Sequence, residues 1–210
     1  MADWPKHPFL CVAIWAVLAL LLVVPIGFAA GSPLLQWRVG IYILAGFSGV
    51  AAMSLLLLQP LLAGGYLPGV SSAQARRLHR WIGCSLVVLV IVHVGGLWVT
   101  SPPDVVDALL FRSPTVFSYF GVIAMWAVFA SALLVTLRTR LSFALWGWQQ
   151  IHTGLAVVIV IGSVVHALLI VGTMEMITKS LLCLAVVIAL LVILVKRRRW
   201  GRQSHMIRRR

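Results

Sequence analysis

The sequence has 210 residues, of which 62% are hydrophobic and only 10% are charged. Soluble domains carry about 25% charged residues, so this composition excludes a soluble globular domain and predicts an integral membrane protein. The net charge of +13 does not indicate a nucleic-acid partner, because the cations lie in short connections and at the chain ends, next to apolar runs. This distribution follows the positive-inside rule, and we expect membrane lipid, and no nucleic acid, around the chain.

The first apolar run follows Lys6 and covers residues 9–30. A cation, an apolar stretch and small residues in this order resemble a secretory signal. The run is long for a signal, however, and we interpret it as an uncleaved transmembrane helix. The second apolar run, 39–63, ends at the helix breakers Gly64 and Pro68.

Turn and capping residues separate the later spans. Ser71 is a candidate N-cap for the third span, and Pro114 suits the first turn of the fourth. We expect the segment 101–113 between them to be a loop along the membrane surface, because part of it is amphipathic, and Ser142 is a candidate cap for the fifth span. The sequence thus predicts a single transmembrane domain over 1–210, with spans at approximately 9–30, 39–63, 73–100, 114–137, 143–171 and 177–196 and a basic cytoplasmic tail over 197–210.

Six spans place both termini on the same side of the membrane. If that side is the cytoplasm, only Arg38, Arg112 and Lys179 among the cations lie outside, together with three of the four acidic residues. Most cations then lie inside, as the positive-inside rule requires; they are Lys6, Arg76, Arg77, Arg80, Arg138, Arg140 and the basic tail. We therefore predict an all-α, six-span bundle with both termini cytoplasmic, in a bacterial-type inner membrane.

Two predicted spans carry histidine pairs with identical spacing. His93 follows His79 by 14 positions in the third span, and His166 follows His152 by 14 positions in the fifth. At about 100° per residue this is close to four whole turns, so the two histidines of each span share one helix face, roughly 21 Å apart along the axis. Because both spans run outward, we expect His79 to face His152 near the cytoplasm and His93 to face His166 toward the outside.

This double pair of imidazoles suits two haem groups bound between the third and fifth spans. Imidazole is a good axial ligand for haem iron, and two histidines fill both axial positions. A six-coordinate iron has no open position for substrate, so the pattern predicts electron transfer, with no catalytic residue in the chain. Glycines near the histidines either leave room for a porphyrin or serve helix packing, and the sequence leaves both interpretations open; they are Gly83, Gly95, Gly96, Gly154 and Gly162.

The alternatives for these histidines are structural hydrogen bonds or a proton relay. Ionisable groups inside membrane spans are costly and usually functional, which favours the haem interpretation. Copper and zinc sites usually need three or four clustered ligands, and the sequence places no other suitable ligand beside either pair. His7 and His205 lie outside the spans, and we expect them to be solvated.

Three arginines, Arg76, Arg77 and Arg80, surround His79 at the start of the third span. A guanidinium group matches the geometry of a carboxylate, so these residues are candidates to bind propionates of the inner haem, with Arg80 as the first choice. The other interpretation is that they only anchor the span on the cytoplasmic side. The sequence does not decide between the two.

A resemblance to a known family rests on two segments, Arg77-x-His79-Arg80-x-x-Gly83 with His93, and Trp148-Gln-Gln-Ile-His152-x-Gly154 with His166. With them the sequence resembles the ferric reductase-like transmembrane family, which includes the membrane cores of NADPH oxidases and ferric reductases and the haem subunit of the bacterial methionine sulfoxide reductase. The resemblance covers approximately residues 9–195. It implies that His79, His93, His152 and His166 are ligands of b-type haems, and that electrons move from the cytoplasm to an acceptor outside.

The sequence departs from the oxidases and the eukaryotic ferric reductases because it lacks their flavin- and nicotinamide-binding domain. The resemblance therefore implies a separate donor, either a cytoplasmic flavoprotein reductase that supplies or shares FMN or FAD, or membrane quinol at a quinone site. The implied acceptor is ferric iron, oxygen or a periplasmic oxidoreductase. We interpret the chain as an oxidoreductase component that needs a donor partner; the alternative is a non-redox membrane subunit that handles haem as cargo or during assembly.

Overall fold

The computed structural model describes residues 8–138, 140 and 145–207. The described residues form α-helices and one short 3-10 helix, with no strand among them. Six of the helices are long and apolar enough to cross a membrane, as the sequence predicts. The elements are α1 (Pro8–Ala30), η1 (Pro33–Leu35), α2 (Gly40–Gly64), α3 (Ser72–Thr100), α4 (Pro102–Leu109), α5 (Val116–Thr136), α6 (Leu145–Leu169) and α7 (Met176–Ile207).

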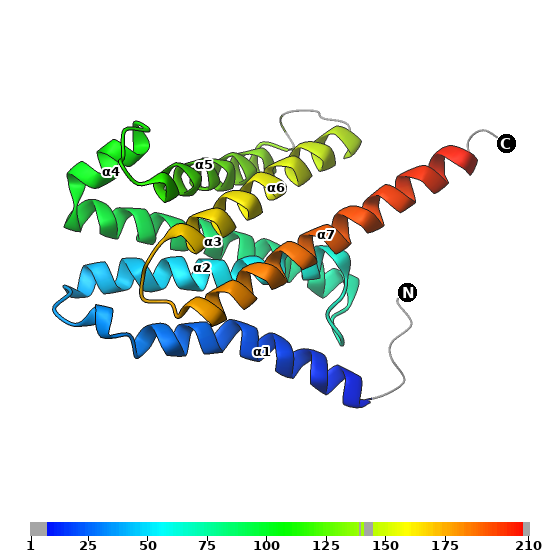
Figure 1. The fold of residues 1–210 in the computed structure, drawn as a ribbon. Coiled ribbons are helices and arrows are strands. Elements are labelled where there is room, and N and C mark those ends of the chain that lie inside the picture. The colour runs from blue at the N-terminus through cyan, green and yellow to red at the C-terminus, as the bar shows by residue number, and fades with distance from the viewer. Residues whose placement is uncertain (1–7, 139, 141–144, 208–210) are drawn as a thin grey trace.

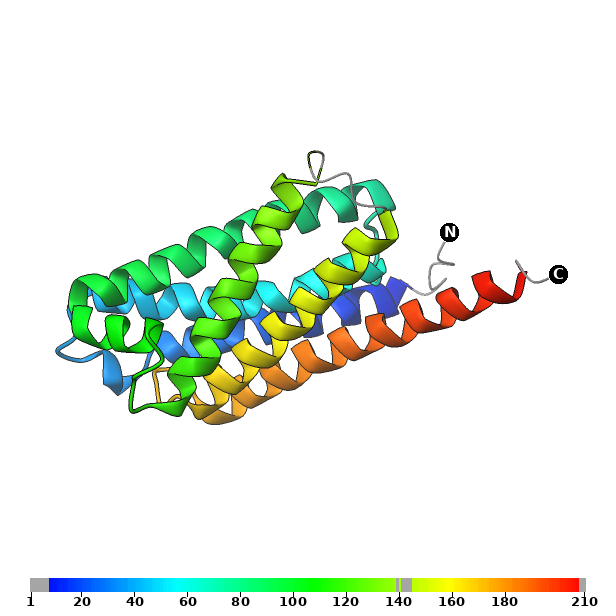
Figure 2. The same ribbon diagram turned by 90° about the horizontal axis from the view of Figure 1, so that it is seen from above.

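The long helices lie alongside one another in a bundle (Figure 1). α1, α3 and α6 begin at the end of the bundle where α7 ends, and α4 lies at the opposite end (Figures 1 and 2). The two histidine-bearing helices, α3 and α6, therefore run in the same direction. Positions equally far from their starts consequently lie at similar depths in the bundle.

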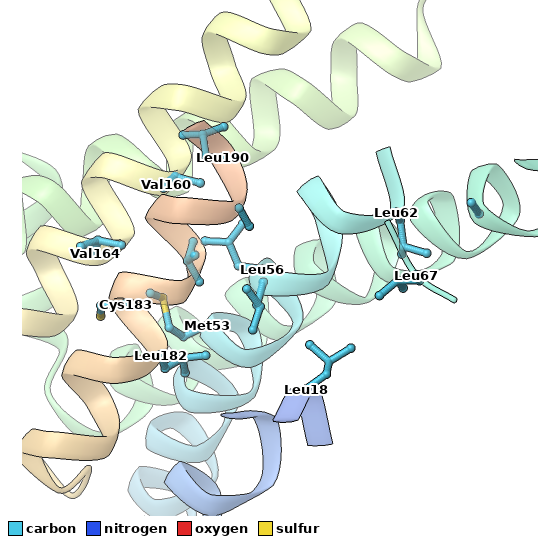
Figure 3. Packing of buried hydrophobic residues seen from close by; sticks show 14 residues of the cluster. Leu18, Met53, Leu56, Leu62, Leu67, Val160, Val164, Leu182, Cys183 and Leu190 are labelled. Carbon is cyan, nitrogen blue, oxygen red and sulfur yellow. The ribbon is translucent and has the colours of Figure 1, made fainter. Parts of the chain in front are cut away.

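Packing divides the bundle into two helix pairs and two further helices. α2 lies along α3, α5 lies along α6, and α7 contacts α1, α2 and α6. Most of the buried apolar cluster comes from α2, α6 and α7, with Leu18 added from α1; it includes Met53, Leu56, Val160 and Leu182 (Figure 3). α3 contributes a single buried residue to this cluster, Ala75, which is also the one buried residue described in α3. The apolar core thus forms around α7, while α3 keeps most of its side chains outside that core.

The start of α3 is fixed by a capping box. The Ser71 hydroxyl accepts a hydrogen bond from the Gln74 backbone N–H (3.3 Å), and the Gln74 side chain accepts one from the Ser71 backbone N–H (2.9 Å). These two bonds satisfy backbone donors that the first turn of a helix leaves free. The cap therefore sets the helix register of every α3 residue that follows.

The connection after α3 differs from the expected loop, because its residues 102–109 form the helix α4. Pro102 and Pro103 occupy its first turn, where proline has a suitable backbone angle and loses no needed donor. Asp104 in the same turn interacts favourably with the positive end of the helix dipole. These three residues favour the start of a helix, which the amphipathic pattern of the segment alone did not predict.

Two other boundaries also differ from the expected ones. α5 begins at Val116 with Thr115 as its N-cap residue, so Pro114 precedes the helix instead of lying in its first turn. α7 continues to Ile207, so the basic segment after 196 continues the helix. The expected cap at Ser142 lies outside the described residues.

Candidate functional site

The four membrane histidines meet in two pairs, one above the other. The imidazole centres of His79 and His152 are 6.2 Å apart with an angle of 73° between the ring planes. Those of His93 and His166 are 6.5 Å apart with an angle of 83°. In each pair one ring comes from α3 and the other from α6. A metal ion bound to two imidazole nitrogens, at about 2 Å from each, fits between rings at this separation, because each ring centre lies behind its own nitrogen.

The outer pair is oriented by backbone carbonyl groups of the neighbouring helices. His93 Nδ1 lies 2.7 Å from the Ala45 carbonyl oxygen on α2, and His166 Nδ1 lies 2.9 Å from the Phe117 carbonyl oxygen on α5. A carbonyl oxygen only accepts hydrogen bonds, so each Nδ1 is the protonated nitrogen and donates. In a neutral imidazole this leaves the lone pair on Nε2. Both outer rings are thus held in the tautomer that binds a metal through Nε2.

The inner pair is held in a related way. His79 Nδ1 donates to the Gln59 carbonyl oxygen (3.3 Å), and the Gln59 side-chain nitrogen donates back to the His79 carbonyl oxygen (3.2 Å). His152 Nδ1 lies 3.0 Å from the Ser131 hydroxyl, which can accept its proton. All four Nδ1 atoms therefore have partners on α2 or α5, and none of the described residues bonds an Nε2.

The two helix pairs α2–α3 and α5–α6 build their halves of the site in the same manner. The outer histidines are 48 and 49 positions from their carbonyl partners. The inner histidines are 20 and 21 positions from theirs. The same arrangement therefore occurs twice in the chain, although we found no fixed-period repeat in the sequence.

A glycine lies against each outer histidine. A Cβ atom on Gly49 would come within 3.0 Å of His93 Nδ1, and one on Gly121 within 2.7 Å of His166 Nδ1. Real Cβ contacts are rarely this short, so the closeness of each ring to α2 or α5 depends on the missing side chain. The role of Gly121 could not be predicted from the sequence, because this glycine precedes His166 by many residues and lies on another helix.

The glycines next to the histidines in sequence have other surroundings. A Cβ on Gly96 would come within 2.8 Å of Ala45 Cβ, and one on Gly162 within 2.9 Å of the Phe120 carbonyl oxygen. These two glycines therefore allow close packing of α3 on α2 and of α6 on α5. A Cβ on Gly95 or Gly154 would meet nothing within 4 Å.

An aromatic stack covers His152 on the side toward the start of α6. The indole ring of Trp148 lies parallel to the His152 ring, with 5.4 Å between centres and 3° between planes. The Arg138 guanidinium lies 4.6 Å from the centre of the Trp148 ring. The sequence did not predict this stack, because Arg138 lies in the turn after α5 and only the fold brings it against Trp148.

The three arginines near His79 lie at the start of α3. The side chains of Arg76, Arg77 and Arg80 are all exposed. Arg77 lines a shallow pocket together with Gln74 and Leu78. The structure therefore places these cations on the surface at the inner level of the site.

The donor set fits haem better than a bare metal ion. Among the described residues, no group of three or more His, Cys, Asp or Glu side chains comes together. Zinc and copper sites usually need such a group. Haem iron takes only its axial ligands from the protein, and two imidazoles supply both. The two facing pairs thus fit the needs of two haem groups.

Six helices long and apolar enough to cross a membrane, with two facing histidine pairs between α3 and α6, define a multi-pass membrane protein. The model of the family described as ferric reductase like transmembrane component matches residues 45–163, more than half of the chain, and the chain belongs to this family. No curated protein and no solved structure matches the chain. The matched segment contains His79, His93 and His152 and ends just before His166. Membership makes the chain an oxidoreductase component that transfers electrons across a membrane.

Proposed function

We propose that the chain binds two b-type haems and conducts electrons from a cytoplasmic donor to an acceptor on the outer side of a bacterial-type inner membrane. His79 and His152 would hold the inner haem, and His93 and His166 would hold the outer one. The observation that supports this proposal is the meeting of α3 and α6 at two levels, with 6.2 and 6.5 Å between ring centres. The proposal is also supported by the four histidine Nδ1 atoms, each of which is hydrogen-bonded to a residue of α2 or α5.

A haem with two imidazole ligands supplies a one-electron change of its iron and no open coordination position. The chain's own residues hold the imidazoles at two depths. Ala45 and Phe117 fix the outer rings through their carbonyl groups, and Gln59 and Ser131 fix the inner rings. The exposed arginines 76, 77 and 80 provide cations for carboxylates at the inner level, with Arg80 nearest to His79 in sequence.

The positive-inside rule gives the direction of the proposed electron transfer. The starts of α3 and α6 and the end of α7 lie at the same end of the bundle, and this is the end with most of the cations. We place it in the cytoplasm, together with both termini. The donor is then a cytoplasmic flavoprotein reductase or membrane quinol, and the acceptor is ferric iron, oxygen or a periplasmic oxidoreductase.

The test is the haem content and the reduced-minus-oxidised optical spectrum of the purified full chain. We expect two b-type haems per chain, with the spectra of six-coordinate iron in both oxidation states. Protein that keeps its helical content by circular dichroism but binds no haem would disprove the proposal. Reduction by a quinol analogue without an added flavoprotein would identify quinol as the donor; reduction only with a flavoprotein and nicotinamide would identify the partner route.

A further inference from the structure

Lys179 is a buried cation inside a membrane-spanning helix. Its side chain lies in the first turn of α7 and is only 3% exposed. Burying a charge is costly, and an ionisable residue within a membrane span usually has a function. The sequence places Lys179 among the outer cations without assigning it a role.

The contacts of Lys179 lead to the outer histidine pair. Its Nζ donates a hydrogen bond to the Ile170 carbonyl oxygen (2.9 Å). The Ile170 backbone N–H in turn bonds the carbonyl oxygen of His166 (3.2 Å), so Lys179 binds α6 one turn beyond His166. The carbonyl end of a helix carries partial negative charge, which favours a cation at this place.

The positive charge of Lys179 is not paired with a carboxylate among the described residues. The nearest acid in sequence, Glu175, uses its carboxylate oxygens to accept from the backbone N–H groups of Ile177 and Thr178. The ammonium group has three donors, and the Ile170 carbonyl oxygen accepts from one of them. Because the side chain is buried, water screens this charge less than it screens a charge at a wet surface.

We propose that Lys179 is a positioning residue of the outer haem site whose charge also raises the midpoint potential of that site. The proposal rests on the two-haem function. The ammonium group holds the end of α6 that carries His166. Its positive charge stabilises the state of the outer site that holds the additional electron, because that state carries one positive charge less. The charge therefore makes electron movement from the inner to the outer level more favourable than it would be without Lys179.

Lys196 offers a matched control at the other end of the same helix. Its Nζ also donates to a carbonyl oxygen at a helix end, that of Gly64 on α2, and the distance is again 2.9 Å. Unlike Lys179, its side chain is exposed, and it lies over the Tyr66 ring at the cytoplasmic end. Removing its charge therefore removes a similar bond without removing a buried charge near the outer pair.

The experiment is a redox titration of the haem-loaded full chain in lipid nanodiscs, followed optically and by electron paramagnetic resonance. Lys179→Gln keeps a hydrogen-bond donor and removes the charge, whereas Lys179→Arg keeps the charge. We expect Lys179→Gln to lower the outer midpoint and leave the inner one unchanged, and Lys179→Arg to stay near the wild-type value. Lys196→Gln should move neither midpoint. The outer midpoint is assigned as the one lost in His93→Ala.

An unchanged outer midpoint in Lys179→Gln would overturn the proposal, and so would an equal shift in Lys196→Gln. Wild-type protein without haem would instead refute the two-haem function. Failure of the Lys179 proposal can thus be distinguished from failure of the two-haem proposal.

Discussion

Replacement of single histidines separates the two levels of the site. In the proposed arrangement, His79→Ala or His152→Ala removes one ligand of the inner haem, and His93→Ala or His166→Ala removes one ligand of the outer haem. We expect haem content to fall from two per chain toward one in each variant, with the spectrum of the other haem retained. Haem-to-protein stoichiometry and low-temperature spectra measure this. Loss of the outer haem alone after an inner substitution would show that the pairing is different.

The histidine spacing could be read from the sequence, but the groups that orient the rings could not. The 14-position spacing places His79 and His93 on one face of a helix by geometry alone. By contrast, Ala45 and Phe117 act through their backbone carbonyl oxygens. Every residue has such a group, so only the packing of α2 on α3 and of α5 on α6 reveals which carbonyls are used.

Gly121 gives a second prediction at the scale of single residues. A Cβ atom in Gly121→Ala would lie 2.7 Å from His166 Nδ1, so the ring must move away from the Phe117 carbonyl group. Overpacking of this kind costs about 1–3 kcal/mol, or roughly one to two orders of magnitude in affinity. We expect weaker binding of the outer haem and an unchanged inner haem, measured by haem titration of the apoprotein.

The control for Gly121 is Gly27→Ala in α1, where an added Cβ would meet nothing within 4 Å. This variant should bind both haems as the wild type does. If Gly121→Ala also bound both haems normally, the close approach of His166 to α5 would not matter for ligation.

At the scale of helices, the apolar runs predict the six spans because each must be long enough to cross the hydrocarbon core. The short helix α4 was missed because its start depends on Pro102, Pro103 and Asp104 and not on a long periodic pattern. The likeness of the α2–α3 and α5–α6 pairs was also missed. Gln59 and Ser131 occupy matching positions in the two pairs, but they are different residue types. Only their hydrogen bonds to His79 and His152 show that the positions correspond.

The start of α7 makes the stability of the protein depend on pH. The Ile177 and Thr178 backbone N–H groups bond the Glu175 carboxylate and hold its pKa below the ordinary value. A lowered pKa means that the folded state prefers the ionised form, so this contribution is present above the ordinary carboxyl pKa of about 4.3. It is lost as pH falls through the lowered pKa of the folded state. We expect Glu175→Gln to be less stable than the wild type at pH 7, with the difference shrinking toward pH 3.

The measurement is thermal unfolding in detergent across this pH range. Asp107→Asn is the control, since its side chain forms no hydrogen bond among the described residues although it also removes an outer negative charge. A Glu175→Gln difference that is the same at pH 7 and pH 3 would show that the cap does not act through its charge.

At the scale of the whole molecule, α7 connects the two helix pairs that carry the histidines. Near its end, Lys196 bonds the Gly64 carbonyl oxygen of α2, and Arg197 bonds the Thr153 hydroxyl of α6, next to His152. The buried apolar cluster joins the same three helices (Figure 3). The separation of α3 and α6 therefore depends on α7, although α7 supplies no histidine to the site.

This architecture predicts directional electron flow through the whole bundle. Vesicles that contain the haem-loaded chain, with a reductant trapped inside and ferricyanide outside, should reduce the ferricyanide at a rate proportional to the protein content. The His93→Ala and His166→Ala variants should reduce it no faster than empty vesicles, because the outer level then lacks a complete ligand pair. Lys196→Gln keeps all four histidines and should support the wild-type rate. Flow that continues without His93 would mean that electrons bypass the outer pair, whereas a haem-loaded wild type without any flow would favour the haem-handling alternative.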